Sequence, residues 1–569
     1  MAKNTVLIIL DGWGIGARDD SNPIYKVKPQ TIEIFKQNYP ATSLQASGIA
    51  VGLPWGEAGN SEVGHLTIGI GKIIYQYYPR ISLAIRTGEF FKNEAINKAF
   101  DFALKNNSAV HCLGLLSESH AHSSYDHILA LMQMAVQKKV AKLYFHFFTD
   151  GRDSRPKSAK ELVDRFMSDA KKIGVGKVGS LSGRYYALDR SKTWDLTSRV
   201  YNLLVDGEGR KAKTTDEVFS YFYTEKKLTD PYIEPTLIVE SEDVNTWPLI
   251  RDNDALIFFD FREDSIRQLV SAFVLEEFSN FPRRKLKNIH ITTMTQYDKT
   301  FPVSVAFYPE KIETSLTAEI SKHGLKQMKI AETEKYYHLT YFFNGLTDKV
   351  FPNEFRILIP SKETPHPDEY PAMRAPEITD RLIAAMMENV YDFIAVNYAN
   401  PDTIAHTGNY NAVMEAIKIV DQQLAKVYEV AQKIGATLIV TADHGNAERL
   451  YNPLTGEKET HHDTSPVPFY LVDERFKLKI PRTEEQIEEM ESQTIGSLCD
   501  IAPTILELMN LPIPIEMSGV SLLTNSRRSF QLELAGSSIQ ESLAQYHTKN
   551  RLFDFPSLQF VLRCAEFLI

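Results

Sequence analysis

The chain has 569 residues, of which 43% are hydrophobic and 24% charged, a composition typical of folded globular proteins and not of disordered ones. Its net charge of -10 argues against nucleic acids and acidic membranes as partners, because proteins that bind these are normally basic. No apolar run approaches the roughly 18 residues of a membrane span, and the first apolar run is too short for a signal peptide.

Three widely spaced cysteines occur, at Cys112, Cys499 and Cys564. This spacing predicts neither a disulfide framework nor a cysteine-rich zinc site, and it is consistent with a reducing compartment. We therefore expect a cytoplasmic protein without membrane or nucleic-acid partners.

Short apolar runs alternate with longer amphipathic segments along the chain. The runs predict strands at Thr5–Leu10, Ala109–Leu115, Lys142–Phe148, Ala255–Phe259, Ile289–Thr293, Phe393–Asn397 and Thr437–Thr441. The amphipathic segments predict helices at Ile81–Lys105, Ser158–Lys172, Asp264–Glu277, Ile378–Asn389 and Asn411–Ile434. This alternation indicates an α/β fold with largely parallel sheets.

The distribution of reactive motifs suggests that one domain is inserted into another. Such motifs lie in Asp11–His65 and again in Asp402–His462, and the long stretch between them has a different, arginine-rich set. We predict a discontinuous domain of residues 1–75 and 309–523 with a second domain, 76–308, inserted. Residues 524–569 form a C-terminal extension of unassigned role. Within it, Leu532, Leu534 and Ile539 either pack on the body or belong to a mobile tail.

Asp11 directly follows the first predicted strand, at the end where functional groups of α/β sheets gather. Gly12, Gly14 and Ala17 spell the G-x-G-x-x-A of a dinucleotide site. Turn-forming residues follow where that motif requires a helix, so we reject the dinucleotide interpretation. Asp11 is either a functional carboxylate or the cap of a turn.

Ser61 lies in the sequence GNSEVGH, between two glycines that let the backbone bend and expose its hydroxyl. A free hydroxyl is a weak nucleophile and needs a base or a metal ion to activate it. Neither the G-x-S-x-G motif of hydrolases nor the Walker A motif is matched. Taken alone, the segment is better interpreted as a serine in a glycine turn.

Aspartate and histidine residues follow two further predicted strands in patterns that favour metal binding. The candidates are Asp11, Asp402, His406, Asp443, His444 and the adjacent pair His461 and His462. Oxygen and nitrogen ligands without thiolate suit manganese, and zinc or magnesium would also fit. Three aspartates and three histidines suffice for two metals about 3.5–4 Å apart, the geometry of two-metal phosphoryl transfer.

Arginines in the predicted insert follow strand or turn signals. Guanidinium groups bind carboxylates and phosphates in a bidentate manner, so in an acidic protein such a group indicates an anion pocket. The residues are Arg152, with Asp153 beside it, Arg184, Arg190 and Arg262. Lys335 lies outside the predicted insert.

Together these motifs resemble one family, the cofactor-independent phosphoglycerate mutases of the alkaline phosphatase superfamily. LDGWG, GNSEVGH, DGRD, GRYYA, AETEK, NPD-x-x-x-H and ADHGN occur in that order, and the resemblance covers about residues 3–523. It implies an alkaline-phosphatase-like three-layer domain with a second α/β domain inserted. It also implies a monomeric glycolytic isomerase that interconverts 3-phosphoglycerate and 2-phosphoglycerate without bisphosphoglycerate.

The resemblance also implies roles for individual residues. Ser61 would become phosphoserine, and Asp153 and Lys335 would assist catalysis. One Mn²⁺ would be bound by Asp11, Ser61, Asp443 and His444, and the other by Asp402, His406 and His462. His462 is preferred to His461 because of its spacing to Pro466. The substrate pocket would comprise His122, Arg152, Asp153, Arg184, Arg190, Arg262 and Lys335.

The chain departs from the family pattern at two places. The segment Glu118–Ser124 is altered but keeps His122, and Ser265 stands where the family often has a second arginine, which Arg267 could replace. Another two-metal phosphoryl-transfer enzyme, a phosphatase or phosphopentomutase, is the alternative, although DGRD and GRYYA favour phosphoglycerate. A non-catalytic metal-binding protein would be expected to lack the nucleophile or ligands, all of which are present.

Overall fold

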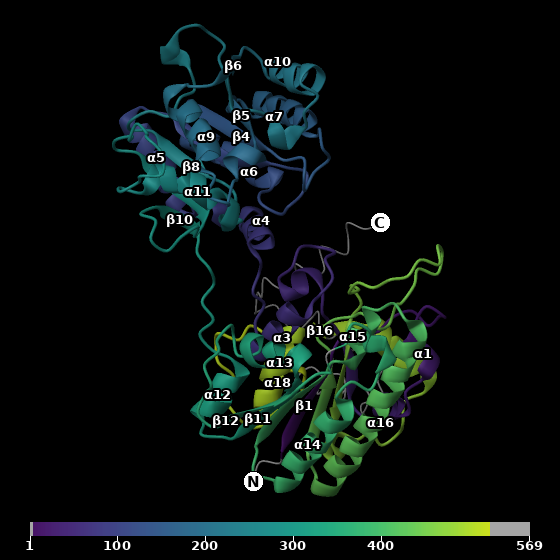
Figure 1. Ribbon diagram of the computed structural model, residues 1–569. Coiled ribbons are helices and arrows are strands. Elements are labelled where there is room, and N and C mark those ends of the chain that lie inside the picture. Colours follow the sequence, from purple (N-terminus) through teal and green to yellow (C-terminus); the bar gives the residue numbers. More distant parts are fainter. Residues whose placement is uncertain (1–3, 363, 524–569) are drawn as a thin grey trace, which may run out of the picture. The chain divides into compact units, whose positions relative to one another are not determined.

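The computed structural model describes residues 4–523 except residue 363. The predictions for the C-terminal extension 524–569, including those for Leu532, Leu534 and Ile539, and Cys564 lie outside the described residues. The chain forms two compact units (Figure 1). Unit 1 contains described residues 4–51, 56–73 and 312–523, and unit 2 contains 52–55 and 74–311.

Unit 1 is built on a sheet with the strand order β12-β11-β13-β1-β14-β15-β2-β16. The strands are β1 (Thr5–Leu10), β2 (Ala41–Gln45), β11 (Gln327–Glu332), β12 (Glu354–Ile359), β13 (Phe393–Tyr398), β14 (Thr437–Thr441), β15 (Val467–Val472) and β16 (Thr494–Ser497). β1 pairs in parallel with β13 and β14, so that Leu7 lies opposite both Ala395 and Ile439. Only β15 runs antiparallel to its neighbours among the described strands of this sheet.

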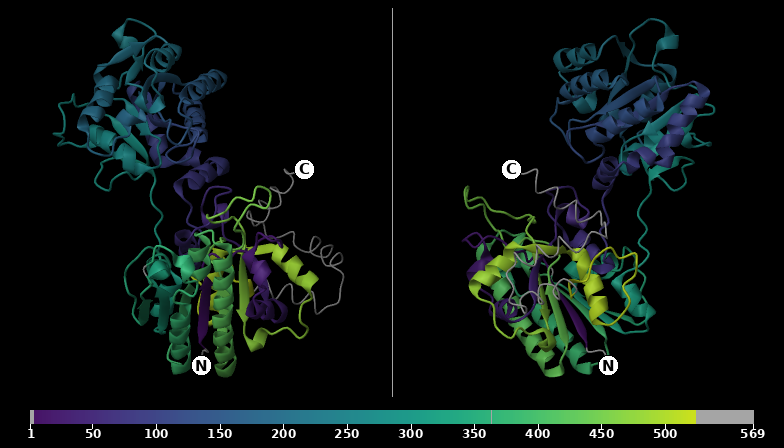
Figure 2. Two further views of the ribbon diagram at one scale, coloured as in Figure 1. Left: turned by 45° about the vertical axis from the view of Figure 1, so that its right-hand side comes forward. Right: turned by 180° about the vertical axis from the view of Figure 1, so that it is seen from behind.

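The central strands of unit 1 are covered on both faces. Every residue of β1, β11, β13 and β14 is buried, which explains the largely apolar runs of β1, β13 and β14, whereas β11 also buries Gln327, Lys329 and Glu332. The long helices α14 (Ala375–Glu388) and α16 (Tyr410–Ile434) pack together over the sheet (Figure 2). A second group, α3 (Ser61–Ile70), α12 (Leu316–Lys322) and α18 (Ile501–Leu508), packs together, with α12 also against β11. Unit 1 is therefore a helix–sheet–helix sandwich.

The remaining helices of unit 1 are short. They are α1 (Pro23–Val27), α2 (Gln30–Asn38), α13 (Thr333–Tyr337), α15 (Asn400–Ala405) and α17 (Glu484–Ser492). No helix begins between Asp11 and Asn22, which confirms that the glycine-rich turn is not a dinucleotide fingerprint.

Unit 2 has its own sheet, with the order β10-β9-β8-β3-β4-β5-β7-β6. The strands are β3 (Val110–Leu116), β4 (Leu143–Thr149), β5 (Lys177–Gly183), β6 (Arg210–Ala212), β7 (Thr236–Ile238), β8 (Ala255–Phe258), β9 (His290–Thr295) and β10 (Ser304–Phe307). Alternate residues of β3 enter different cores: Val110 and Cys112 belong to one apolar cluster, and Leu113 and Leu115 to another. Both faces of this sheet are therefore also packed.

The helices of unit 2 are α4 (Tyr77–Thr87), α5 (Glu94–Asn106), α6 (Tyr125–Lys138), α7 (Ala159–Ile173), α8 (Arg184–Ala187), α9 (Trp194–Asp206), α10 (Thr215–Phe219) and α11 (Glu263–Val274). The single helix predicted over Ile81–Lys105 is wrong. Gly88 ends α4 with φ +82°, and the Asn93 side chain caps α5 by accepting a hydrogen bond from the Ile96 amide at 3.2 Å. A glycine terminator and an asparagine cap thus override the amphipathic period.

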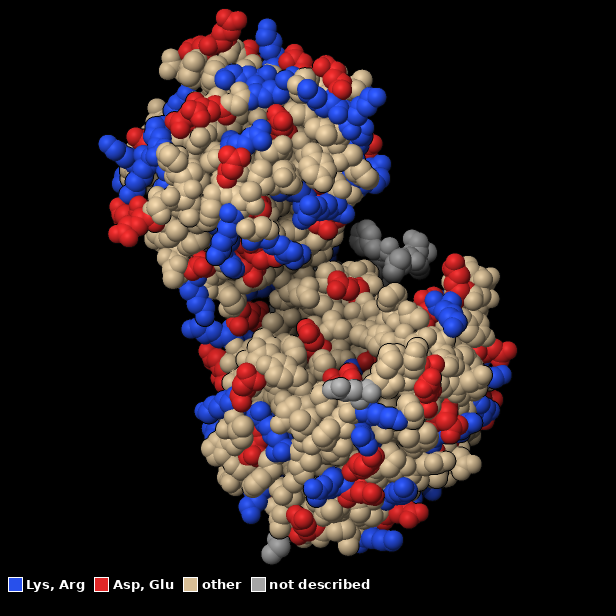
Figure 3. All heavy atoms as spheres, in the orientation of Figure 1, with Lys and Arg blue, Asp and Glu red and all other residues tan. Residues whose placement is uncertain are grey.

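The predicted α/β class is confirmed, and each predicted strand overlaps an observed one. The cysteines Cys112 and Cys499 are free and buried. Within residues 4–523, residue 363 excepted, no helix has both the length and the apolar character that crossing a membrane would need. On the face drawn in Figure 3, Lys and Arg are interspersed with Asp and Glu.

Candidate metal and phosphoryl-transfer site

The site of unit 1 forms where three neighbouring strands end. Asp11 follows β1, Asp402 lies on α15 just after β13, and Asp443 follows β14. Because the three strands are parallel and adjacent, their carboxyl ends bring these carboxylates to one edge of the sheet. The backbone locks the loops together: the Gly12 amide donates a hydrogen bond to Asp443 Oδ1 at 3.1 Å.

Ser61 is the first residue of α3 and is buried, at 6% exposure, so the expectation of an exposed hydroxyl in a glycine turn is wrong. Asn60 caps the helix by accepting a hydrogen bond from the Val63 amide at 3.0 Å. Gly64 serves close approach: a Cβ there would lie 2.4 Å from the backbone oxygen of Asp443. α3 can therefore lie directly against the loop that carries Asp443.

Three charged or polar groups surround the Ser61 hydroxyl. Its Oγ lies 3.2 Å from Asp11 Oδ1 and 3.0 Å from His444 Nε2. Lys335 Nζ donates a hydrogen bond to the same oxygen at 2.7 Å. The hydroxyl oxygen thus lies within hydrogen-bond distance of an ammonium donor, a carboxylate acceptor and an imidazole nitrogen.

The candidate metal ligands form two groups. Asp11, Asp443 and His444 can offer ligand atoms within 4.8 Å of one another, and so can Asp402, His406 and His462. The groups adjoin, because His444 Nε2 lies 4.0 Å from Asp402 Oδ1. His461 is exposed and belongs to neither group.

Two imidazoles of the second group are oriented for a cation. The Nδ1 atoms of His406 and His462 lie 2.8 and 2.9 Å from the backbone oxygens of Thr460 and Gly59. A carbonyl only accepts, so both Nδ1 atoms carry hydrogen, and the Nε2 atom of each ring is the one left to offer a lone pair to a cation. These Nε2 atoms face each other at 3.1 Å and lie 3.2 and 3.3 Å from Asp402 Oδ1. Three acceptors in mutual contact fit a bound cation.

The charges of the buried side chains in the site also favour a bound cation. Burial opposes the charge of Lys335, yet Asp11 and Asp402, each 2.6 Å from Nζ, raise its pKa, so it is an ammonium. Burial and the charge of Asp443 raise the pKa of Asp11. One ammonium among three buried carboxylates leaves negative charge that divalent cations would balance. The residues present therefore fit metal ions with oxygen and nitrogen ligands.

The predicted substrate residues of unit 2 form a separate cluster. Arg184 pairs with Asp150 and donates a hydrogen bond to Asp153 Oδ2 at 2.7 Å and to His122 Nε2 at 3.1 Å. Burial, together with the charges of Arg184 and Arg262, lowers the pKa of His122 to about 4, so this ring is neutral. The cluster therefore combines a neutral acceptor, a fixed guanidinium and a carboxylate.

A second part of the cluster is centred on Asp264, which pairs with Arg190 at 2.6 Å and with Arg262 at 2.9 Å. Burial raises the pKa of Asp264, but Arg262 outweighs this effect and lowers the pKa to about 2. The Arg152 side chain is exposed. Arg267 donates to the Tyr297 backbone oxygen at 2.6 Å, so it is engaged there. Lys335 belongs to the site of unit 1, where it contacts Ser61, Asp11 and Asp402.

Comparison with known proteins places the chain in a family. A model of the metalloenzyme superfamily matches residues 3–513. The 2,3-bisphosphoglycerate-independent phosphoglycerate mutase of Clostridium perfringens (strain SM101 / Type A) is 43% identical over 522 residues, which cover 92% of this chain and 99% of that protein. Mutase 1 of Methanosarcina barkeri is 42% identical over 522 residues, covering 92% and 98%. The chain belongs to the family of 2,3-bisphosphoglycerate-independent phosphoglycerate mutases.

A solved structure of Leishmania mexicana phosphoglycerate mutase at low cobalt concentration is also similar, with 27% identity, coverage of 91% of this chain and 97% of that chain, and a TM-score of 0.49. Membership of this family confirms the predicted enzyme, a phosphoglycerate mutase and thus an isomerase, and the alternatives, a phosphatase or a phosphopentomutase, are not supported. The superfamily match and the two ligand groups also identify the chain as a metalloenzyme.

Sequence reasoning missed the residues that orient the mutase ligands. Asn397, the fifth residue of β13, donates to Asp11 Oδ2 at 2.7 Å and to His65 Nε2 at 3.0 Å. The side-chain amide of Asn446 donates a hydrogen bond to Asp402 Oδ1 at 2.8 Å. The sequence does contain a sign of both residues, because Asn397 is a polar residue in a buried strand and Asn446 lies within ADHGN. Neither residue type has reactive chemistry of its own, so neither was singled out.

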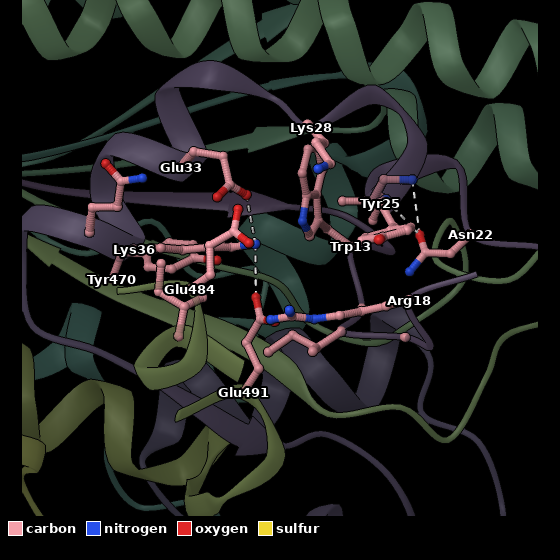
Figure 4. Close-up of a pocket in the computed structure, with 16 residues that line it drawn as sticks. Trp13, Arg18, Asn22, Tyr25, Lys28, Glu33, Lys36, Tyr470, Glu484 and Glu491 are labelled. Carbon is pink, nitrogen blue, oxygen red and sulfur yellow. Dashed lines mark hydrogen bonds and ion pairs between the residues drawn. The ribbon is translucent and has the colours of Figure 1, made fainter. Parts of the chain in front are cut away.

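A cavity of about 290 Å³ lies elsewhere in unit 1 of this mutase, beside Trp13 and the segment from Gly14 to Gly16 (Figure 4). Its charged groups pair with one another: Lys36 lies 3.0 Å from Glu33 and 2.8 Å from Glu491. None of the predicted site residues lines this cavity. It is therefore distinct from the candidate site.

Proposed function

We propose that this chain interconverts 3-phosphoglycerate and 2-phosphoglycerate through a phosphoserine at Ser61, without bisphosphoglycerate. The observation that carries the proposal is the set of groups that surround the hydroxyl oxygen of Ser61. Ser61 Oγ lies within 3.2 Å of a buried carboxylate, an imidazole nitrogen and an ammonium. A hydroxyl so placed is oriented and electrostatically stabilised for attack on phosphorus.

The helix position of Ser61 supports a phosphorylated intermediate. Ser61 is the first residue of α3, where free amides and the helix dipole favour negative charge. A phosphoryl group on its oxygen would lie at this helix N-terminus and near the Lys335 ammonium. Phosphoserine is stabilised by such surroundings.

We propose that two divalent ions, Mn²⁺ in the first instance, are held by the two groups described above. Asp11, Ser61, Asp443 and His444 would hold one ion, and Asp402, His406 and His462 the other. Bound there, such ions would lower the pKa of the serine hydroxyl and balance charge on the transferring phosphoryl group. Mg²⁺ or Zn²⁺ would also suit these ligands.

The phosphoryl group is then transferred in two steps, first from the substrate to Ser61 and then from Ser61 back to the glycerate. Ser61 Oγ forms a bond to phosphorus while the bond to the C3 oxygen of the substrate breaks, and the proton of the serine hydroxyl ends on that C3 oxygen. The glycerate then reorients. The Asp153 carboxylate, paired with Arg184, removes the proton of the C2 hydroxyl, whose oxygen attacks phosphorus as the bond to Oγ breaks. That proton passes to Oγ, so Ser61 regains its hydroxyl and Asp153 its charge, and Lys335 donates to the serine oxygen throughout.

We propose that unit 2 binds the glycerate part of the substrate. Arg184 and His122 would hold its polar groups beside Asp153. Arg190 and Arg262 would bind a carboxylate or phosphate of the ligand, which would displace Asp264 from them. Arg152, whose side chain is exposed, would add a further guanidinium. Unit 1, as the metal-binding unit, would supply Ser61 and Lys335.

The test is an assay of 2-phosphoglycerate formation from 3-phosphoglycerate without bisphosphoglycerate, combined with mass spectrometry of acid-quenched enzyme. We expect turnover and a phosphate on Ser61, and we expect Ser61→Ala to abolish both. The matched control is Ser315→Ala, which removes the cap of α12, costs about 1 kcal/mol of stability and leaves turnover intact. Release of inorganic phosphate without 2-phosphoglycerate would identify a phosphatase instead.

We further propose that the enzyme acts as a cytoplasmic monomer in glycolysis. Free, buried Cys112 and Cys499 are consistent with a reducing compartment. The net charge of -10 suits a small-molecule enzyme that binds neither nucleic acid nor membrane.

A further inference from the structure

We propose that Glu448 is a positioning residue that holds the loops bearing the metal ligands in register, an inference that rests on the two-metal proposal above. Glu448 is fully buried and lies just beyond the motif ADHGN. It is neither a member of the two ligand groups nor a contact of the Ser61 hydroxyl. Its role must therefore act through other residues.

The Glu448 carboxylate joins two loops through one oxygen. Its Oε2 accepts hydrogen bonds from the backbone amides of Gly14, at 3.0 Å, and Asn446, at 2.7 Å. Gly14 belongs to the loop that starts at Asp11, and Asn446 to the loop that carries Asp443 and His444. A buried amide without an acceptor costs about 1–3 kcal/mol, so both loops are tied to this oxygen.

The glycines of these loops make room for Glu448. A Cβ on Gly14 would lie 2.2 Å from Glu448 Cδ, and one on Gly445 would lie 2.3 Å from Oε1. A Cβ on Gly16 would lie 2.8 Å from both Cγ and the backbone oxygen of Glu448. Glu448 thus explains Gly14 of the G-x-G that mimics a dinucleotide motif, whereas a Cβ on Gly12 would lie 2.8 Å from the Cβ of Asp402.

The same anchor reaches the second ligand group through Asn446. Its backbone amide binds Glu448, and its side chain donates to Asp402 Oδ1 at 2.8 Å. The neighbouring Ala447 amide donates to the Gly12 oxygen at 2.9 Å. Glu448 is therefore connected to ligand-bearing segments after all three strands, β1, β13 and β14.

The loop held by Glu448 borders a cavity. Gly14 and Gly16 also line the 290 Å³ cavity beside Trp13, and Glu448 is not among the residues lining it. Gly14 lies between two other backbone anchors, the Gly12 amide, which donates to Asp443 Oδ1 at 3.1 Å, and the Ile15 amide, which donates to the Pro466 oxygen at 2.7 Å. Loss of the Glu448 contact would therefore leave Gly14 with room to shift between these anchors. Fixed contacts of this kind determine how well ligands are oriented for a metal.

The experiment compares two substitutions of similar size in the full chain. Glu448→Gln keeps an acceptor oxygen, whereas Glu448→Met fills the space without one. Mn²⁺ affinity and stoichiometry are measured by electron paramagnetic resonance of free Mn²⁺ during titration. We expect the Met variant to bind Mn²⁺ about 10- to 100-fold more weakly, the loss that is typical when a residue that orients a metal ligand is removed. The Gln variant should bind Mn²⁺ as tightly as the unmodified chain does.

Asp421→Leu is the matched control. Asp421 is also buried and accepts backbone hydrogen bonds, from Thr31 at 3.0 Å and Ile32 at 3.2 Å, but these amides belong to α2. This variant should lose stability while keeping its Mn²⁺ affinity. An equal loss of affinity in Asp421→Leu would show general destabilisation and overturn the proposal.

The remaining outcomes separate the two proposals. Unchanged Mn²⁺ affinity in Glu448→Met, or equal losses in the Met and Gln variants, would overturn the role of Glu448 alone. Absence of Mn²⁺ binding in the unmodified chain would overturn the two-metal proposal itself. If Glu448→Met does not fold, the affinity of Glu448→Asp, whose shorter side chain cannot reach both amides, takes its place with the same expectation.

Discussion

Lys335 Nζ lies 2.7 Å from Ser61 Oγ and 2.6 Å from Asp11 Oδ1 and Asp402 Oδ2. An ammonium has three hydrogens, and these three acceptors take all of them. Because the carboxylates keep Lys335 charged, it cannot act as a base toward Ser61. Its role is to orient the hydroxyl oxygen and stabilise negative charge there.

Removing this ammonium should separate catalysis from metal binding. We expect Lys335→Met to lower kcat about 10²- to 10³-fold, the range found when a donor to a developing anion is lost. Mn²⁺ affinity should stay the same or rise, because a positive charge beside the ligand carboxylates has been removed. Steady-state kinetics and Mn²⁺ titration measure the two effects.

Lys329→Met is the matched control, since Lys329 is equally buried on β11 but donates to Thr317 at 2.8 Å and pairs with Glu354 at 3.2 Å. It should affect stability without a comparable loss of kcat. A fall in kcat of the same size in both variants would contradict the assigned role of Lys335.

Chelation should remove activity and lower the temperature of thermal unfolding, and Mn²⁺ should restore both. Metal bound only to the folded protein at 100 times its dissociation constant adds about 2.7 kcal/mol of stability. Mn²⁺ affinity should also fall in mild acid, because Asp402 raises the pKa of His406 and protons compete for this ligand. Activity that survives both treatments would contradict metal dependence.

Asp260 of unit 2 should make stability depend on pH. Burial raises its pKa to about 8; Oδ1 accepts a hydrogen bond from the Leu115 amide at 2.7 Å, and Oδ2 has no partner among the described residues. Between about pH 4 and 8 the folded state keeps a proton that the unfolded chain has lost, so stability falls as pH rises. Asp260→Asn should remove this contribution.

The prediction is checked by denaturant unfolding of both proteins from pH 5 to 9. The asparagine variant should gain relative stability steadily up to about pH 8, with no further gain above it. A constant difference across the range would mean that Asp260 ionises normally.

The packing between Gly14 and Glu448 should appear as strong coupling in a double-mutant cycle. Gly14→Ala places a methyl group within 2.4 Å of the carboxylate atoms and should cost about 1–3 kcal/mol of stability, which Glu448→Ala should partly relieve. Gly16→Ala is the comparison, because its methyl group also meets the Glu448 backbone oxygen, which truncation leaves in place. Equal relief at both glycines would contradict the geometry.

The strands and reactive ligands could be predicted because each has a direct signal in the sequence. β1 and β14 are apolar runs bounded by turn residues, and their observed bounds are those predicted. Asp11 and Asp443 are reactive residues directly after such runs. Once the strands are parallel neighbours, proximity of these carboxylates follows from topology.

What the sequence could not predict depends on side-chain direction and on contacts distant along the chain. The glycines around Ser61 indicated a turn, but Gly64 is required by the backbone of Asp443, hundreds of residues away in sequence. Arg267 was a plausible replacement for the arginine missing at Ser265, yet its guanidinium binds the Tyr297 carbonyl. Glu448 was overlooked because a buried carboxylate that binds backbone amides leaves no pattern of reactive residues.

The central position of β1 has a consequence for how the protein is made. Thr5 of β1 lies opposite Phe393 of β13 and Thr437 of β14, which are 388 and 432 residues later in the chain, so β1 is synthesised long before the strands with which it pairs. Unit 2, which is nearly continuous from residue 74 to 311, can fold during that interval. During synthesis unit 2 should therefore fold before unit 1, and chaperones would encounter the apolar β1 segment while it is still unpaired.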